Sequence, residues 1–133
     1  MLRSLQRALL LLICLSLAAC QSGKPEPKKY PVSGTVTVDG KPMEDDGLIY
    51  FKTIATGAIN GFDIKAGKFS GATEPGDRRV EIVAYRITNV DSGGMKSEVK
   101  ESLIPSRYNT ESTLTAKVTP EGPNTFTFDL TSK

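Results

Sequence analysis

The chain has 133 residues, with 17 basic and 15 acidic side chains, no histidine and no tryptophan. Arg3 and Arg7 are the only charged residues before Cys20, so the remainder carries equal numbers of both signs and no basic field for nucleic acid. Without histidine, the chain lacks the usual general base, the Ser/His and Cys/His nucleophile pairs and the commonest transition-metal ligand. These counts argue against nucleic-acid binding and against most hydrolase chemistry.

Residues 1–19 have the features of a secretory signal. Arg3 and Arg7 precede an uncharged run from Ala8 to Leu17, and two small residues follow that run. The run is shorter than the roughly 20 apolar residues that a membrane-spanning helix requires. We therefore expect residues 1–19 to form a signal helix that is removed on export.

The sequence Leu17-Ala18-Ala19-Cys20 closes this run. Ordinary signal cleavage favours small residues at the third and first positions before the cut, and Leu17 does not suit the third position. The four residues resemble the lipobox of bacterial lipoproteins, whose Cys takes a diacylglyceryl group and becomes the first mature residue. The resemblance implies lipidation of Cys20, a membrane contact through that lipid and export to a bacterial envelope. Gln21 is not Asp, so the familiar signal for inner-membrane retention is absent and the outer membrane is favoured.

Residues 20–29 contain Cys20 and a polar segment with two prolines and no apolar periodicity, which is typical of a flexible tether. Cys14 belongs to the discarded signal, so no free thiol remains for a disulfide. Residues 30–133 are enough for one domain with one core and too few for two. That domain must be held together by packing alone.

Short segments rich in β-branched residues fill residues 30–133. Val32, Val36 and Val38 alternate with polar residues, as in a half-buried strand, and turn signals such as Asp39-Gly40 separate the segments. This pattern predicts an all-β fold, a single antiparallel seven-stranded β-sandwich. We expect the last two strands to form a hairpin. The seven expected strands are residues 32–38, 48–52, 59–64, 68–70, 79–87, 114–118 and 126–130. In the fifth of these, we expect Val80, Ile82 and Ala84 to face the core.

The segment from Tyr30 to Pro42 resembles the opening of carboxypeptidase-regulatory-like, or transthyretin-like, β-sandwich domains, which begin with a strand Val-x-Gly-x-Val and a turn. Gly67-Lys68-Phe69 and the stretch from Pro75 to Ile82 resemble the later Gly-x-Phe and Pro-Gly-x-Tyr-x-Val segments, with an arginine where an aromatic residue is commoner. With the lipobox, the tether and residues 104–109, the chain is similar to small bacterial lipoproteins of this kind. In peptidases, this Ig-like module is an accessory to a separate catalytic domain. The resemblance therefore implies no catalytic residue and no cofactor.

Glu44, Asp45 and Asp46 form the one acidic cluster. Carboxylate oxygens from a loop are suitable ligands for calcium, but the spacing matches no EF-hand loop. A solvated turn is the alternative interpretation, and we expect no metal site.

Two further groups have a functional and a structural interpretation. Arg78 and Arg79 suit an acidic partner, or protect the exposed start of a strand from edge-to-edge aggregation. Tyr85 and Tyr108 suit stacking on a sugar, or packing on the outer face of a sheet and in a loop.

Residues 88–109 join two predicted strands and are much longer than the usual connection of about 4–6 residues. We expect a flexible start at Asp91-Ser92-Gly93-Gly94 and one or two helical turns between Lys96 and Leu103, since Val99 and Leu103 are four apart. Loops of this length are usually functional or disordered, so the tip is a candidate partner-contacting surface or a mobile insertion. The candidate contact residues are Ser92, Gly93, Gly94, Lys96 and Lys100.

These observations favour a lipid-anchored, non-enzymatic domain of the cell envelope that binds or positions another macromolecule, either an envelope protein or a polysaccharide. A carbohydrate- or calcium-binding sandwich is the alternative, and an enzyme with a carboxylate or lysine mechanism is a more distant one. A row of exposed aromatic side chains would favour sugar binding. Converging carboxylates would favour calcium.

Overall fold

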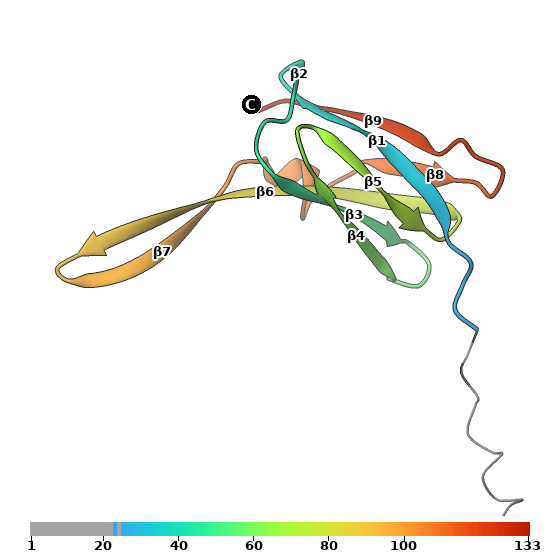
Figure 1. Cartoon of the computed structure of the whole chain (residues 1–133), viewed down its shortest axis with the longest axis horizontal. Helices are drawn as coiled ribbons and strands as arrows, with labels where there is room; N and C mark the ends of the chain where they lie inside the picture. The colour runs from blue at the N-terminus through green and yellow to red at the C-terminus, as the bar shows by residue number, and fades with distance from the viewer. Residues whose placement is uncertain (1–22, 24) are drawn as a thin grey trace, which may run out of the picture.

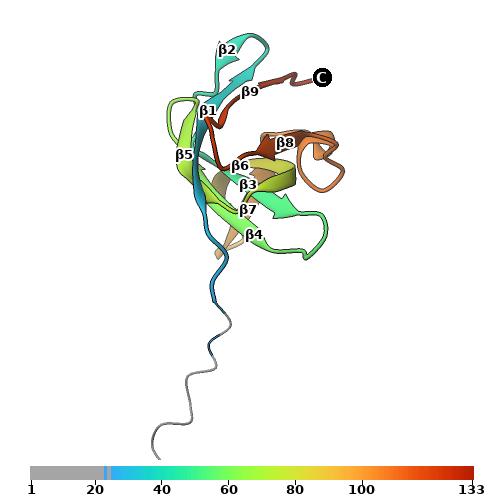
Figure 2. The same ribbon diagram turned by 90° about the vertical axis from the view of Figure 1, so that its right-hand side faces the viewer.

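The computed structural model describes Gly23 and residues 25–133, which form an all-β fold of nine strands in two sheets (Figures 1 and 2). The expected signal helix and Cys20 lie outside the described residues. Among the described residues, the only helix is a three-residue 3-10 turn, η1 (Ser106–Tyr108). No helix in this part of the chain has the length and apolar character needed to cross a membrane.

The first sheet is built around β1 (Tyr30–Val38). β5 (Lys68–Thr73) pairs with it antiparallel, and β2 (Lys41–Pro42) pairs with its last two residues. β9 (Thr125–Leu130) pairs with β1 in parallel. The expectation of a purely antiparallel fold is therefore wrong at this pair. A parallel neighbour requires a long connection, and here residues 39–124 lie between the two strands.

The second sheet has the order β4 (Ile59–Ile64), β3 (Gly47–Thr53), β6 (Gly76–Ser92) and β7 (Met95–Ser102). β8 (Thr115–Val118) pairs with the start of β6, on the same side as β7. All neighbouring strands of this sheet are antiparallel. β6 is the longest strand of the described chain and connects the layered body to a projecting hairpin (Figure 1).

The seven predicted strands correspond to β1, β3, β4, β5, β6, β8 and β9. The predicted count was wrong because β2 and β7 are also strands. The predicted hairpin of the last two strands was wrong as well, because β8 pairs with β6 and β9 pairs with β1. Residues 119–124 carry the chain from one sheet to the other, where Asn124 donates to the carbonyl oxygens of Thr119 and Pro31 at 2.9 and 3.2 Å.

The core lies between the two sheets and follows the alternation of the sequence. Val80, Ile82 and Ala84 on β6 face inward, as the pattern predicted. All five phenylalanines of the chain form one connected cluster, with neighbouring ring centroids 5.8–6.3 Å apart. This cluster joins both sheets because its members come from β3, β4, β5 and β9: Phe51, Phe62, Phe69, Phe126 and Phe128.

Arg78 is buried, with 1% of its surface exposed, which corrects the expectation of an exposed pair of arginines. Its guanidinium donates to the carbonyl oxygens of Glu74 and Pro75, both at 3.0 Å, and lies 3.5 Å from the Glu74 carboxylate. A buried charge is retained only when it is paired and hydrogen-bonded, and the bend before β6 supplies partners for Nε and Nη2, whereas Nη1 has none among the described residues. Arg78 therefore fixes the bend at which β6 begins.

Candidate functional site

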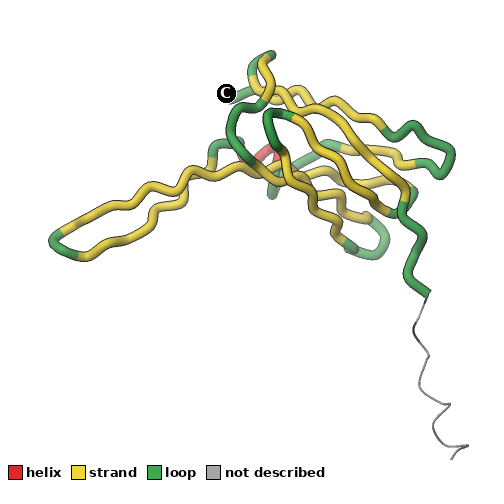
Figure 3. The backbone as a smooth tube through the Cα atoms, viewed as in Figure 1, coloured by secondary structure: helices red, strands yellow, loops and turns green. Residues whose placement is uncertain are grey.

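Residues 85–102 form a two-stranded arm, here called the β6–β7 arm, that projects from the layered body (Figures 1 and 3). β6 is paired with β3 only as far as Ala84, and beyond that point β7 is its single neighbour among the described strands. Every residue from Tyr85 to Ser102 is exposed, whereas Ala84 is 2% exposed. The arm is therefore a surface feature, with no contribution to the core.

The tip of the arm is a two-residue turn at Gly93 and Gly94. Both glycines have positive φ, 63° and 83°, as the tight turns favoured in hairpins require. The Gly94 N–H donates to a carboxylate oxygen of Asp91 at 3.2 Å. The expected helical turns between Lys96 and Leu103 are wrong, because this segment is β7. Residues four apart share a face in a strand as well as in a helix, so that spacing could not separate the two structures.

The base of the arm is fixed to the body. The Leu103 N–H donates to the Ala84 carbonyl at 2.9 Å, and the Ser102 hydroxyl donates to the Ile104 carbonyl at 2.9 Å. Ile104 is 4% exposed and belongs to the core. Tyr108, which follows in η1, packs against the same core, as the sequence suggested. An isolated hairpin is marginally stable in water, so this mounting holds the arm in place.

One face of the arm is largely polar and charged. Opposite residues in the register share a face, which places Asp91 beside Lys96 and Asn89 beside Glu98. Lys100 lies on this face with its Nζ 3.9 Å from the centre of the Tyr85 ring. Ser92, Gly93 and Gly94 lie at the tip, so the structure brings all five candidate contact residues into the arm. It places Lys96 and Lys100 on one face of β7.

The opposite face of the arm carries exposed apolar side chains that the sequence analysis missed. Val90, Met95 and Val99 lie on this face, with 41%, 78% and 49% of their surfaces exposed. An ion pair between Arg86 and Glu101, 3.8 Å apart, closes its inner end. The signal that could have revealed this hairpin, and with it this face, is the Gly93-Gly94 pair, which is typical of a two-residue hairpin turn.

The acidic cluster lies between β2 and β3, where Glu44, Asp45 and Asp46 are all exposed. Asp46 pairs with Lys65 at 2.5 Å, and this hydrogen bond raises the pKa of the Lys65 amine. Among the described residues, no group of three or more Cys, Asp or Glu side chains is arranged to hold a metal ion. The cluster therefore fits a solvated turn in which one carboxylate is already paired.

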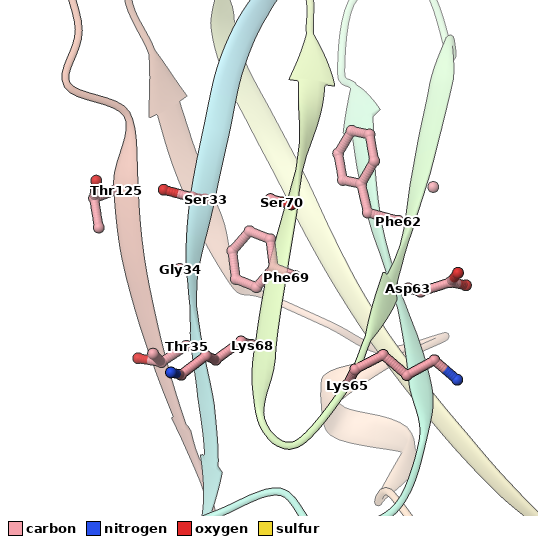
Figure 4. Close-up of a pocket in the computed structure, with 11 residues that line it drawn as sticks. Ser33, Gly34, Thr35, Phe62, Asp63, Lys65, Lys68, Phe69, Ser70 and Thr125 are labelled. Atoms are coloured by element: carbon pink, nitrogen blue, oxygen red, sulfur yellow. The ribbon is translucent and has the colours of Figure 1, made fainter.

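A shallow groove of roughly 870 Å³ runs over β1, β5 and β4 (Figure 4). Lys68 extends toward Thr35, whereas Asp63 and Lys65 extend away from it on the β4 side. Phe69 is only 4% exposed, so it offers no open ring for a sugar. The remaining polar side chains are small hydroxyls on the outer face of the first sheet: Ser33, Ser70 and Thr125.

The tyrosines do not form a row on the surface. Tyr85 is exposed and covered by Lys100, whereas Tyr30, Tyr50 and Tyr108 are partly buried. Within residues 25–133, no pair of aromatic rings is displayed to solvent as a sugar-binding platform would require. The β6–β7 arm is therefore the most prominent exposed feature of the described chain.

Searches against protein-family models, curated proteins and solved structures found no match to this chain.

Proposed function

We propose that this chain is a lipid-anchored, non-enzymatic module of a bacterial cell envelope, exported and held through Cys20, that binds or positions another protein through its β6–β7 arm. The observation that carries the proposal is the arm itself: residues 85–102 are exposed throughout, are mounted firmly on the core and have outer strand edges with which no described strand pairs. Exposed strand edges pair readily with other chains, so proteins that retain long ones commonly use them for binding. The lipobox-like sequence from Leu17 to Cys20 supports the anchor.

We further propose that residues 30–133 are a transthyretin-like β-sandwich. Two packed sheets with a shared apolar core are consistent with this class. The Val-x-Gly-x-Val opening forms β1, where Gly34 leaves room for the Phe69 ring. The Gly-x-Phe segment begins β5 and sends Phe69 into the core. The residues that carry the resemblance therefore have structural roles.

The point where the tether enters the body and the arm lie at opposite ends of β6, which supports a display role. The tether enters the body at Tyr30, which pairs with Thr73, and Thr73 lies three residues before the start of β6. The arm occupies the other end of this 17-residue strand, roughly 55 Å away at about 3.3 Å per residue. The arm therefore extends away from the point where the tether enters the body (Figure 1).

The anchor is tested with Cys20→Ser. Wild-type protein should incorporate a fatty-acid analogue and partition into the membrane fraction, because two or more acyl chains anchor a protein stably. Cys20→Ser should incorporate none, and it should leave that fraction or keep its signal uncut. Equal labelling of the two proteins would refute the anchor, and fractionation would test the outer-membrane assignment.

The arm is tested with a photo-crosslinking amino acid at Met95, and Ile54 serves as the matched control. Both side chains are apolar and highly exposed, at 78% and 67%, but Ile54 lies in the turn after β3, away from the arm. Illumination of cells should give a discrete adduct from position 95 and none from position 54. Absence of any adduct at position 95, or equal adducts at both positions, would refute binding through the arm.

A further inference from the structure

We propose that the outer edge of β7 binds β7 of a second copy of this chain, antiparallel and centred on Val99, so that two arms form one four-stranded ribbon. This proposal deepens the proposed function by naming the partner of the β6–β7 arm, and it rests on the arm being the contact surface. It does not depend on the lipid anchor.

The outer edge of β7 pairs with no described strand. Leu103 donates to the carbonyl of Ala84, its register partner, so this pair is hydrogen-bonded across the ladder. Hydrogen-bonded and non-hydrogen-bonded pairs alternate along an antiparallel ladder. The register from Tyr85↔Ser102 to Ser92↔Met95 is continuous. The backbone groups of Lys96, Glu98, Lys100 and Ser102 therefore point outward, where no described strand covers them.

The charged side chains along that edge alternate in sign. Lysines on an edge strand discourage indiscriminate pairing, but here Glu98 stands between Lys96 and Lys100. A strand of this pattern is complementary to itself only in some registers. Opposite charges that face each other across strands are stabilising, and like charges are destabilising.

These charges favour one register of the two β7 strands over the others. A pair centred on Glu98 sets two carboxylates opposite each other, and a pair centred on Lys100 sets two amines opposite each other. A pair centred on Val99 places Glu98 opposite the partner's Lys100, and this contact occurs twice by symmetry. Centring on Ser97 also matches the charges but overlaps fewer residues of β7. The register centred on Val99 is therefore the longest one without opposed like charges.

The apolar face of the arm also favours this register. In the register centred on Val99, this residue lies opposite the partner's Val99, on the face that also carries Val90 and Met95. Val99 is 49% exposed in the single chain. Val90 is the diagonal neighbour of Val99 within each arm, so the pairing joins the valines of two arms into a slanted row across four strands. A hairpin is marginally stable alone, and independent stability needs three or more strands with an apolar face, so the ribbon adds the strands that each arm lacks.

The proposed pair of arms is symmetric. The two β7 strands run antiparallel in one ribbon, so a two-fold axis perpendicular to the ribbon relates the copies and the same surface is used on both. The two β6 strands then run in opposite directions, and each enters its own body at an opposite end of the ribbon. In this register residues 96–102 of the two copies pair with each other, all within β7, and each body lies beyond the paired segment at the base of its own arm.

The register is tested by single cysteine substitutions in the full-length protein, kept with its anchor in detergent micelles. Val99 and the partner's Val99 would form a non-hydrogen-bonded pair, whose Cα separation of about 4.5 Å suits a disulfide. Val99→Cys should therefore give a reducible dimer on mild oxidation. Ser97→Cys is the matched control on the same face and should give none, and the unsubstituted protein reports any crosslink through Cys20. Crosslinking at position 97 instead of 99, or at neither, would overturn the proposal.

The charge pattern is tested by sedimentation of the same protein. Glu98→Lys turns both charge-matched pairs into opposed lysines and should raise the dimer Kd about tenfold. Lys100→Glu should do the same, and the double substitution should restore the wild-type Kd, which a merely structural defect would not allow. Failure of the double substitution to restore the dimer, or a wild type that remains monomeric, would overturn the proposal.

The photo-crosslinking experiment at Met95 separates this proposal from the proposed function. An adduct of twice the mass of the chain supports pairing of two copies. An adduct with a different protein, together with no crosslink at position 99, overturns the pairing and leaves the arm as a binding surface. Absence of any adduct overturns both.

Discussion

Phe128 lies at a junction of the aromatic cluster. Its ring centroid is 6.1 Å from that of Phe69 and 6.3 Å from that of Phe126, and 6% of the residue is exposed. Phe128→Ala would remove these contacts and leave a cavity between the sheets. We expect a loss of about 3–5 kcal/mol in the free energy of unfolding, out of roughly 5–15 for a small domain. Urea denaturation measures it, and a loss below about 1 kcal/mol would contradict the packing described.

The phenol of Tyr108 is expected to ionise below the ordinary pKa of tyrosine. A hydrogen bond with the Thr131 hydroxyl, aided by Arg107 and the Thr131 N–H, lowers the pKa of the phenol from 10.0 to about 8. A pKa that is lower in the folded state gives a stabilising contribution that is complete above the ordinary pKa near 10. That contribution is lost as the pH falls through about 8.

An ultraviolet absorbance titration of the wild type and Tyr108→Phe measures this shift. One of the four tyrosines should ionise near pH 8 in the wild type, and that step should be missing in the variant. Identical titration curves for the two proteins would show that Thr131 does not hold the phenolate.

Single residues were predictable where the period of two decides their side. Val80, Ile82 and Ala84 are buried as expected, because alternate residues of a half-buried strand face the core. The burial of Arg78 was not predicted, because a charged side chain is normally exposed. It lies two residues before Val80, on the same side of β6, and is buried with it. Only the folded bend at Glu74 and Pro75 supplies the carbonyl oxygens that make its burial tolerable.

The turn of the arm gives a prediction at the scale of an element. Gly93 and Gly94 have positive φ, and an added Cβ would meet no other atom within 4 Å. Substituting both by Val therefore strains only the backbone, by about 1–2 kcal/mol per residue. We expect faster amide hydrogen exchange in residues 86–101, with the thermal midpoint of the body unchanged.

Gly34→Ala is the matched control for the turn. A Cβ at Gly34 would lie 1.9 Å from the backbone oxygen of Phe126, so this change should lower the thermal midpoint of the whole domain. If the substitutions at Gly93 and Gly94 lowered that midpoint as much as Gly34→Ala, the arm would be part of the cooperative fold. Its description as a separate projecting element would then be wrong.

The elements were predicted best where the local pattern is unambiguous. β4 has the bounds expected from the sequence, and β6 was recognised as far as Ile87. β7 was missed because its residues lack buried neighbours, so no alternation of apolar and polar residues marks them. The candidate contact residues were still found, because an unusually long connection indicates an exposed segment whatever its structure.

Strand partners were predicted less well than strands. The parallel pairing of β1 with β9 joins the two ends of the domain, from Ser33↔Thr125 to Val38↔Leu130. A period of two shows which side of a strand is buried, but it does not show which strand lies beside it. β8 and β9 therefore read as a hairpin, although the six residues between them cross from one sheet to the other.

The whole domain is expected to unfold in one transition. The phenylalanine cluster draws on both sheets, so neither sheet keeps its core when the other opens. Circular dichroism at far- and near-ultraviolet wavelengths should therefore give coincident urea transitions, and the far-ultraviolet spectrum should be dominated by β-structure. A chelator should leave the midpoint unchanged, because packing is expected to supply the stability. Separate transitions, or unfolding by the chelator, would contradict this picture.

The position of β1 has a mechanical consequence. Thr35 and its neighbours are hydrogen-bonded to β5 on one side and to β9 on the other, and the chain leaves the body at Tyr30 (Figure 2). A force that pulls the tether away from the body acts along β1, so the bonds on both sides resist it together by shear. A hairpin pulled at its open ends instead breaks one bond at a time. The strand nearest the tether is thus arranged to transmit tension into the sheet without opening it.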